Sequence, residues 1–330
     1  MAKRGRFNTY KVQGMPLSEK VSAGNAFFVG NSTANSDTVT AVDDINSHGT
    51  INRPFATLDY AYNQCVANRG DTIYILEGHA ETLSSSASFI PDTAGVSIIG
   101  LGHGTNRPTF TAGSTAAGTQ TITFTGANNT MQNCNFVANS SAAFHDGDPL
   151  ISIEAADVQI EGCEFRNTGS SAFFTTVVSI GTTARSCNNV SIANNNFRMI
   201  ETSSSGTMKG VTIGNDSTEP GSVFHDGISV SGNTFVGVFN KAAIYSYSSG
   251  NLHTNIRISN NAVYSACSGP SGLCIDLNSA VTGIAFRNVL TNASATNHKA
   301  TFDSGALLCV ENYASNAVDE GGTIVPPAGS

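Results

Sequence analysis

Apolar and polar residues alternate with a period of two along most of the chain, in short runs that end in Gly, Asn or Ser. The clearest runs share an eight-residue phrase: apolar, any, apolar, any, Gly or Asn, Cys or Asn, any, and often Phe. The best copies are NTMQNCNF from Asn129, VQIEGCEF from Val158, VSIANNNF from Val190 and ISVSGNTF from Ile228. Weaker copies are VSIIGLGH from Val96, IRISNNAV from Ile256, IAFRNVLT from Ile284 and LLCVENYA from Leu307. A period of two rather than 3.6 predicts strands instead of helices.

Successive copies of the phrase begin 33, 29, 32, 38, 28, 28 and 23 residues apart. This variable spacing excludes a strict short repeat and favours coils of a parallel solenoid, whose turns accept insertions while the strands stay in register. Further strand candidates lie between the phrases, at 150–153, 176–180, 210–213 and 243–245. The sequence therefore predicts an all-β right-handed parallel β-helix of some eight or nine coils, with two or three strands per coil.

The phrase also predicts which side chains stack inside the coils. Val158 and Ile160 share one face of a strand and point inward, and the Gly or Asn that follows tolerates the left-handed backbone of a tight bend. The rings expected to form one ladder are Phe136, Phe165, Phe197 and Phe235. The side-chain amides expected to form a second ladder are Asn195, Asn233, Asn261 and Asn312. Cys134 and Cys163 occupy the rung of these amides, which indicates buried packing thiols.

An open solenoid end exposes apolar surface and unpaired strand edges, so a cap is expected at the N-terminal side. Residues 54–67 have apolar positions at helical spacing, and Pro54 suits the first helical position. A strand at 26–29 is expected beside the first coil. The predicted division is a basic N-terminal arm at 1–24, a cap with a short helix at 25–70, the β-helix at 71–313 and an extended tail at 314–330.

The charge of the chain is unevenly placed. Five basic residues stand against one acidic residue in 1–20, a net charge of +4, and the remainder carries −12, which gives the −8 of the whole chain. The basic residues of this arm are Lys3, Arg4, Arg6, Lys11 and Lys20. Such an arm docks on a negative partner; a solvated tail that aids solubility is the alternative. The acidic body lacks the broad basic patch that phosphate contacts require, so we expect no nucleic-acid binding.

Composition narrows the class further. Charged residues make up only 12% of the chain against 40% hydrophobic residues, which argues against disorder. No segment approaches the ~20 apolar residues of a membrane span, and the basic start is not followed by the apolar region of a secretory signal. The seven cysteines form no CxxC pair, so neither a zinc site nor a full disulfide framework is indicated. A disulfide between Cys267 and Cys274 that closes a loop is an alternative to two free thiols. We expect synthesis in a reducing host cytoplasm.

Two phrases carry residues capable of chemistry. Glu77, His79 and Glu81 alternate and could share a face as a metal or acid–base cluster, or form an ordinary polar turn beside the cap. The sequence FHDG occurs at 144–147 and again at 224–227. His beside Asp could ligate a cation or act as a general base, although Asp and Gly equally supply a β-turn. Neither phrase is specific, so we predict no metal ion and no cofactor.

Catalytic carboxylates are harder to place. Hydrolysis of a glycoside needs two carboxyls facing each other at ~5–9.5 Å. Glu161 and Glu164 flank Cys163 too closely to be a convincing pair. The aspartates Asp146, Asp148, Asp157 and Asp226 are dispersed along the chain. No nucleophile elbow, phosphate loop or dinucleotide fingerprint occurs. We therefore predict no catalytic residue and a protein that is not an enzyme.

Three tyrosines remain as candidates for ligand contact. Tyr245, Tyr247 and Tyr264 could stack on sugars in a glycan-binding groove. Packing between subunits explains them equally well, because tyrosine combines an apolar ring with a polar tip.

The chain resembles the right-handed β-helix repeat proteins encoded by tailed bacteriophages. The residues that carry the resemblance are 52–61 (NRPFATLDYA), 68–82 (NRGDTIYILEGHAET), 94–102 (AGVSIIGLG) and 106–108 (NRP). They cover about residues 25–110, and the later coils match only in style. The resemblance implies a β-helix with an N-terminal helical cap and a role on the virion, often as a homotrimer. It leaves shell decoration and tail adhesion both open.

Our leading hypothesis from the sequence is a non-enzymatic capsid decoration (cement) protein on the virion surface. Its basic arm would grip the major capsid protein of the phage shell, and three arms on one trimer would add weak contacts through effective concentration. The alternative is a tail-associated β-helical adhesin or depolymerase that acts on host surface polysaccharide. The two differ in what they bind: a protein shell in the first, a glycan in the second.

Overall fold

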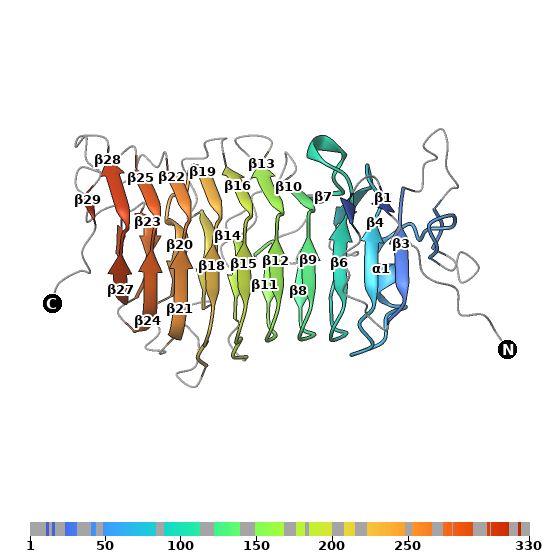
Figure 1. Cartoon of the computed structure of the whole chain (residues 1–330), viewed down its shortest axis with the longest axis horizontal. Helices are drawn as coiled ribbons and strands as arrows, with labels where there is room; N and C mark the ends of the chain where they lie inside the picture. Colours follow the sequence, from blue (N-terminus) through green and yellow to red (C-terminus); the bar gives the residue numbers. More distant parts are fainter. Residues whose placement is uncertain are drawn as a thin grey trace.

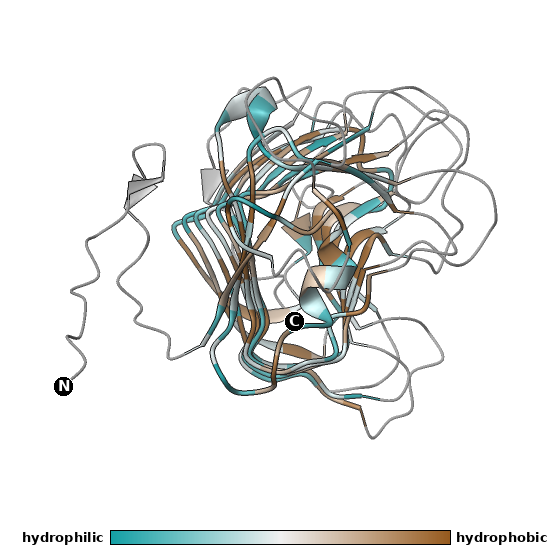
Figure 2. Ribbon diagram, turned by 90° about the vertical axis from the view of Figure 1, so that its right-hand side faces the viewer, coloured by the Kyte–Doolittle hydropathy of each residue, from teal (hydrophilic) through white to brown (hydrophobic). Residues whose placement is uncertain are grey.

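The chain is an all-β parallel β-helix, as predicted (Figure 1). The computed structural model describes residues 11–12, 15–16, 24–31, 41–43, 49–83, 89–112, 122–138, 149–167, 176–181, 185–199, 208–214, 223–247, 253–265, 273–278, 280–292, 302–303, 305–316 and 323–324. Two ten-stranded sheets run the length of the solenoid and a seven-stranded sheet covers its later coils, and the chain adds one strand to a sheet before it moves to the next sheet. In the view along the solenoid axis the strands of successive coils superpose as walls around a central core (Figure 2).

Sheet 1 has ten strands, one or two more than the eight or nine coils expected. Its strands are β3 (Ala26–Val29), β4 (Thr72–Ile75), β6 (Ser97–Gly100), β9 (Thr130–Gln132), β12 (Gln159–Glu161), β15 (Ser191–Ala193), β18 (Ser229–Ser231), β21 (His253–Ser259), β24 (Val281–Phe286) and β27 (Ala306–Val310). β3 pairs in parallel with β4, so the strand expected at 26–29 starts the solenoid.

Sheet 2 follows sheet 1 after a two-residue corner in most coils. Its strands are β5 (Ala80–Leu83), β7 (Thr109–Ala112), β10 (Asn135–Ala138), β13 (Glu164–Asn167), β16 (Asn196–Met199), β19 (Thr234–Gly237), β22 (Ala262–Ser265), β25 (Val289–Asn292), β28 (Tyr313–Asn316) and β29 (Thr323–Ile324). β29 pairs antiparallel with β28, so residues 323–324 of the expected tail lie beside the last coil. The 3-10 turn η1 (Gly104–Asn106) lies in the long corner before β7.

Sheet 3 has seven strands in the described part of the chain, and it completes the coils whose sheet-2 strands are β7 to β25. Its strands are β8 (Ile122–Phe124), β11 (Ile151–Ile153), β14 (Thr176–Ile180), β17 (Lys209–Ile213), β20 (Ala242–Ser246), β23 (Leu273–Asp276) and β26 (Phe302–Asp303). The strands β11, β14, β17 and β20 overlap the strand candidates that the sequence placed between the repeated phrases, at 150–153, 176–180, 210–213 and 243–245. A separate antiparallel pair, β1 (Lys11–Val12) with β2 (Met15–Pro16), lies in the N-terminal arm.

At the corner between sheets 1 and 2, a residue with a left-handed backbone conformation is followed by an asparagine whose side-chain amide is buried. Asn194 and Gly232 hold the first position with φ of 56° and 68°. At the second position, Asn233 accepts hydrogen bonds from the backbone N–H of Asn195 at 2.9 Å and from its side-chain amide at 3.1 Å. The same bonds link the members of the ladder Asn195, Asn233, Asn261, Asn288 and Asn312. Each coil is thereby tied to the next at its tightest bend.

The sequence did not indicate Asn288 as a member of the ladder, because the copy of the phrase assigned to Ile284 starts one residue too late. The pairing of β21 with β24 sets Gly283 opposite Ile256 and Ala285 opposite Ile258. A Cβ on Gly283, whose φ is 143°, would collide with the backbone oxygen of Ile256. Only glycine fits at this apolar position of the phrase, and the sequence pattern therefore hid the true frame.

A column of phenylalanine rings fills the core behind sheet 2. The consecutive centroid distances are 5.6, 5.1, 4.8 and 4.4 Å along Phe110, Phe136, Phe165, Phe197 and Phe235. The planes of neighbouring rings lie within 22° of each other, so they stack. Phe110, from a coil with a degenerate phrase, extends the four-ring ladder by one member. Parallel register explains the stack, since equivalent residues in adjacent coils lie ~4.8 Å apart.

The N-terminal cap contains a helix that is shorter than predicted. α1 spans Leu58–Tyr62, whereas 54–67 was expected. Pro54 is therefore not at the first helical position. The extended residue Thr57 is the N-cap instead, and its hydroxyl accepts a hydrogen bond from the backbone N–H of Tyr60 at 3.3 Å. The chain before the helix stays extended because the backbone N–H of Phe55 donates to the carbonyl of Phe28 on β3.

The described cysteines are packing residues. Cys134 and Cys163 are buried on the corner rung that precedes the asparagines. A hydrogen bond to Cys163 and complete burial raise the pKa of the Cys134 thiol well above its usual value. Cys274 is a buried thiol, and Cys267 lies outside the described residues. Among the described residues, no helix is long and apolar enough to cross a membrane.

Candidate functional site

One row of residues on sheet 3 changes from small hydroxyls to larger functional groups. Register places these residues at equivalent positions in successive coils. In order they are Thr123, Ser152, Ser179, Thr212, Tyr245, Asp276 and Asp303, here called the sheet-3 column. Their strand neighbours Ile151, Val211 and Ile275 are fully buried in the core, so alternation sets the column on the opposite face. Ser179 and Thr212 are buried, whereas Asp303 is exposed. The accessible part of the column is its C-terminal end.

Lysines and tyrosines surround that end of the column. The Lys209 ammonium donates a hydrogen bond to the Tyr247 hydroxyl at 2.7 Å and lies 5.0 Å from the centroid of that ring. The Lys241 ammonium lies 4.8 Å from the centroid of Tyr245. The Tyr245 and Tyr247 rings meet edge to face at 5.0 Å. Each ammonium is thus placed against a ring, a favourable cation–π arrangement that fixes the orientation of both tyrosines.

An ion pair adds a carboxylate to this cluster. Lys241 contacts the Asp276 carboxylate at 2.9 Å, with both side chains partly exposed. Partial burial lowers the pKa of Lys241, but the hydrogen bond and charge of Asp276 outweigh it and raise that pKa overall. Partial burial also raises the pKa of Tyr245, against the opposing charge of Lys241. The raised pKa values keep Lys241 an ammonium and Tyr245 a phenol at neutral pH, beside the side chain of Asp276.

Asp276 and Asp303 supply a pair of carboxyls that the sequence did not indicate. They are paired residues of β23 and β26 and share the sheet-3 column. Adjacent strands lie ~4.8 Å apart, so the two side chains start within reach of each other; a retaining glycosidase holds its two carboxyls ~5–5.5 Å apart. Asp303 also accepts a hydrogen bond from the backbone N–H of Gly305 at 3.1 Å, which orients it. The sequence carries one signal for this pair: an aspartate follows an apolar residue in both Ile275–Asp276 and Phe302–Asp303.

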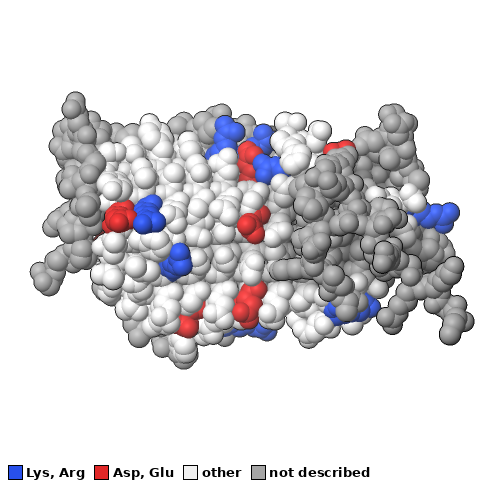
Figure 3. Space-filling view, in the orientation of Figure 1, with Lys and Arg blue, Asp and Glu red and all other residues white. Residues whose placement is uncertain are grey.

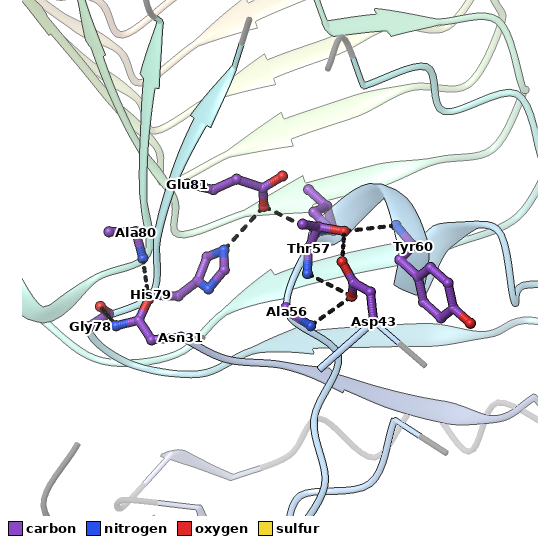
Figure 4. Close-up of polar contacts among 10 residues, drawn as sticks. Asn31, Asp43, Ala56, Thr57, Tyr60, Gly78, His79, Ala80 and Glu81 are labelled. Carbon is purple, nitrogen blue, oxygen red and sulfur yellow. Dashed lines mark hydrogen bonds and ion pairs between the residues drawn. The ribbon is translucent and has the colours of Figure 1, made fainter. Parts of the chain in front are cut away.

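The polar phrase of the first coil belongs to the cap. His79 is buried, and its Nε2 lies 3.1 Å from the Glu81 carboxylate. The same carboxylate accepts a hydrogen bond from the backbone N–H of Leu58 at the start of α1. Figure 4 shows Glu81 between His79 and the helix. Asp43 accepts hydrogen bonds from the backbone N–H groups of Ala56 and Thr57, which precede the helix. Glu81 and His79 therefore hold the helix against the solenoid.

The second FHDG phrase is also structural. His225 is fully buried and stacks on His253 with ring centroids 4.8 Å apart. Its Nδ1 accepts a hydrogen bond from the backbone N–H of Cys187 at 3.0 Å, which repeats the pattern of the asparagine ladder at another corner. The Asp226 carboxylate accepts hydrogen bonds from the side chains of Thr254 and Asn255 in the next coil. The first copy, at 144–147, lies outside the described residues.

The remaining candidates are separated from the cluster. Glu164 on sheet 2 forms an ion pair with Arg107 at 2.7 Å, and Glu161 accepts hydrogen bonds from the side chains of Gln132 and Asn194 on sheet 1 and its corner. Tyr264 is exposed on sheet 2, whereas Tyr245 lies on sheet 3. Of the arm residues, Lys3, Arg4, Arg6 and Lys20 lie outside the described residues, and Lys11 is described only as part of β1. No group of three or more His, Cys, Asp or Glu among the described residues could hold a metal ion.

Comparison with known proteins finds matches among solved structures only. No family model and no curated protein matches the chain. A GH136 lacto-N-biosidase from Eubacterium ramulus is 11% identical, with a TM-score of 0.44, over 88% of this chain and 55% of that one. A mutant tailspike protein of E. coli bacteriophage HK620, in complex with a pentasaccharide, is 13% identical, with a TM-score of 0.43, over 90% of this chain and 59% of that one. The chain spans little more than half of each structure, and the likeness is one of fold.

The prediction that the chain is not an enzyme is not upheld, and the solved structures that share its fold include a lacto-N-biosidase. That prediction rested on carboxylates that are dispersed along the sequence. The coiled fold removes this premise, because it places Asp276 and Asp303, from different coils, on one face. Separation along the chain is a poor guide to separation in a solenoid.

Proposed function

We propose that this chain is a virion-associated β-helical protein that binds a host surface glycan at the accessible end of the sheet-3 column. The observation that carries the proposal is the placement of Tyr245, Lys241 and Asp276 on adjacent coils of one face. An aromatic ring offers an apolar platform to a sugar ring, and the ammonium and carboxylate offer donors and acceptors to its hydroxyls. Such a mixture of rings and a few oriented polar groups is typical of ligand sites.

This proposal replaces capsid decoration as the leading function. Capsid attachment was inferred from the charge of the basic arm alone. The described surface instead offers the cluster on sheet 3, which suits the tail-associated adhesin or depolymerase. A tail position on the virion follows from that role, because a protein that recognises a host glycan must meet the cell surface first.

The same cluster supports cleavage of the bound glycan. In this proposal the Asp276 carboxylate, oriented by Lys241, attacks the anomeric carbon, and Asp303 gives its proton to the departing glycosidic oxygen. The glycosidic C–O bond breaks as the bond to Asp276 forms. Water, deprotonated by Asp303, then releases the sugar from Asp276 and restores both groups. The spacing of adjacent coils favours this double displacement over an inverting reaction, which needs a wider gap for water.

Tyr245→Ala should weaken glycan binding about tenfold, the loss expected when one stacking ring worth ~1.4 kcal/mol is removed. Binding is measured by biolayer interferometry on immobilised bacterial O-polysaccharides and capsular polysaccharides, both neutral and acidic. Tyr264→Ala removes an exposed ring from sheet 2 and should leave binding unchanged. Equal losses for the two variants, or no binding by the parent protein to any glycan of the panel, would refute the site.

Asp276→Asn and Asp303→Asn should each reduce the release of new reducing ends by at least a thousandfold, because each removes a group that reacts directly. The substrate is the glycan that the parent protein binds best, and products are followed by a reducing-end assay and mass spectrometry. Asp157→Asn, on another part of the solenoid, is the control. Wild-type rates in either site variant would rule out this mechanism, while intact glycan with tight binding would leave an adhesin.

A further inference from the structure

Three arginines gather around a single glutamate on the outer face of sheet 2. Arg166 of β13 and Arg198 of β16 are partners in register, and Glu164 lies two residues before Arg166 on β13. Arg107 reaches the same carboxylate from the corner before β7. We call these four residues the arginine cluster. Figure 3 shows basic side chains gathered around an acidic one over β13 and β16, at the upper edge of a face with few charges.

The arginine cluster has three positive charges and one negative charge, a net charge of +2. Arg107 donates to the Glu164 carboxylate at 2.7 Å, whereas Arg198 lies 3.8 Å from its other oxygen. Arg166 has no ion-pair or hydrogen-bond partner among the described residues. In the described strands β7 to β29 of sheet 2, Glu164 is the only acidic residue. Glu161, across the corner, accepts hydrogen bonds from side chains of sheet 1 and its corner instead.

The pairing of Arg166 with Arg198 is unfavourable in the absence of an anion. Equivalent residues on adjacent strands lie ~4.8 Å apart, and like charges directly opposite each other destabilise a sheet. Both side chains are exposed, Arg198 by 48%. The equivalent positions of the other coils hold the uncharged residues Thr82, Thr111, Val137, Val236, Tyr264, Thr291 and Ser315. The paired charge is therefore a local feature of two coils.

Buried polar atoms beside the arginine cluster lack hydrogen-bond partners. Asn135 and Asn196 flank Glu164 in register on the two adjacent strands. The side-chain oxygen of each and the Nε of Arg107 are buried, and none has a partner among the described residues. Asn135 as a whole is only 4% exposed. Such atoms destabilise a fold, so a network that served stability alone would satisfy them. The two oxygens are acceptors that hydroxyl groups can satisfy.

We propose that the arginine cluster binds an acidic sugar unit of a glycan. The guanidinium groups of Arg166 and Arg198 offer paired N–H donors that match the oxygens of a carboxylate or a phosphate. Arg198 lies 3.8 Å from Glu164 and can therefore turn toward a ligand. The Asn196 oxygen, two residues earlier on the same strand, lacks a donor, and a hydroxyl of the same sugar supplies one. An acidic sugar carries both groups, whereas a neutral sugar has no anion for the arginines.

This site is separate from the proposed glycan site and narrows the class of glycan. The arginine cluster lies on sheet 2 in the middle coils, and the tyrosine–lysine cluster lies on sheet 3 toward the C-terminal coils. The inference rests on the proposed function only in taking a glycan as the partner. Attachment of one polymer at both sites would raise the overall affinity, because the second contact forms at a high effective concentration.

Isothermal titration calorimetry of the full chain tests the site at low salt, where charge interactions are least screened. The probes are trigalacturonate, its neutral carboxyl-reduced counterpart and galactose 6-phosphate, so that a carboxylate and a phosphate are distinguished. At least one acidic probe should bind about tenfold more tightly than the neutral one. Arg166→Gln should weaken that binding about tenfold or more, through loss of a charge-assisted contact. Arg185→Gln, which removes an exposed arginine between β14 and β15, should bind as the parent does.

Glu164→Gln tests the site in the opposite direction. This change removes the carboxylate that competes with an acidic sugar for the guanidinium groups, while its amide oxygen can still accept from Arg107. Binding of the acidic probe should therefore strengthen about threefold or more. A variant that failed to fold could not show such a gain.

Tyr245→Ala separates the two sites, since a short acid at the arginine cluster does not contact this ring, and its affinity should stay unchanged. Equal binding of acidic and neutral probes, parent-like affinity in Arg166→Gln, or weaker binding by Glu164→Gln would each overturn the inference. A loss confined to Tyr245→Ala would also overturn it, because the acid would then bind on sheet 3, and the proposed function would stand. The expected losses and gains on sheet 2, without any effect of Tyr245→Ala on the glycan panel, would refute the sheet-3 site alone.

Discussion

Phe165→Ala should lower the free energy of unfolding by about 3–5 kcal/mol, the usual cost of removing a large ring from a packed core. Phe165 is fully buried and stacks on Phe136 at 5.1 Å and on Phe197 at 4.8 Å. Its loss leaves a cavity in the middle of the ring column, where the coils above and below cannot both move to fill it. Urea unfolding followed by circular dichroism measures the change.

The control for this prediction is the next residue on the same strand. Arg166→Ala shortens an exposed side chain of β13 and should change the free energy of unfolding by less than about 0.5 kcal/mol. If the two variants unfold at the same urea concentration, the ring column does not stabilise the solenoid as described.

The second large effect is expected at the asparagine ladder. Asn233→Ala should lower the free energy of unfolding by about 3–6 kcal/mol. It leaves buried hydrogen-bonding groups in two adjacent coils without a partner, and each such group costs about 1–3 kcal/mol. The groups that lose a partner are the backbone N–H of Asn195 and the carbonyl of Ile192. The amides of Asn195 and Asn261 also lose a bond each.

A neighbouring asparagine offers the matched comparison. Asn194→Gly alters the exposed corner residue with φ of 56°, a conformation that glycine adopts without strain, so stability should change by only a few tenths of a kcal/mol. Hydrogen exchange adds a local readout, since Asn233→Ala should speed exchange of the Asn195 amide selectively. Unchanged protection of that amide would contradict the role assigned to the ladder.

Most of the solenoid could be predicted from local pattern. Period-two alternation identifies strands, and a glycine or asparagine after each strand identifies the bend, because both signals depend only on neighbouring residues. The predicted repeat was displaced by one residue at Gly283. Glycine stands there instead of the expected apolar residue, because only glycine fits beside the Ile256 carbonyl. The helix of the cap was predicted too long, since the hydrogen bond from Phe55 to β3 competes with helix formation before Thr57.

The sequence by itself determined the fold class, most of the ladder positions and the uneven charge, since each follows from residue type along the chain. It could not determine which side chains gather on sheet 3, where loops of unequal length separate the strands. Only the register of the coils brings Tyr245, Asp276 and Asp303 into one column. In a parallel solenoid, neighbours in space are one coil apart in sequence, and the length of that coil varies. The tertiary structure therefore decided the candidate site.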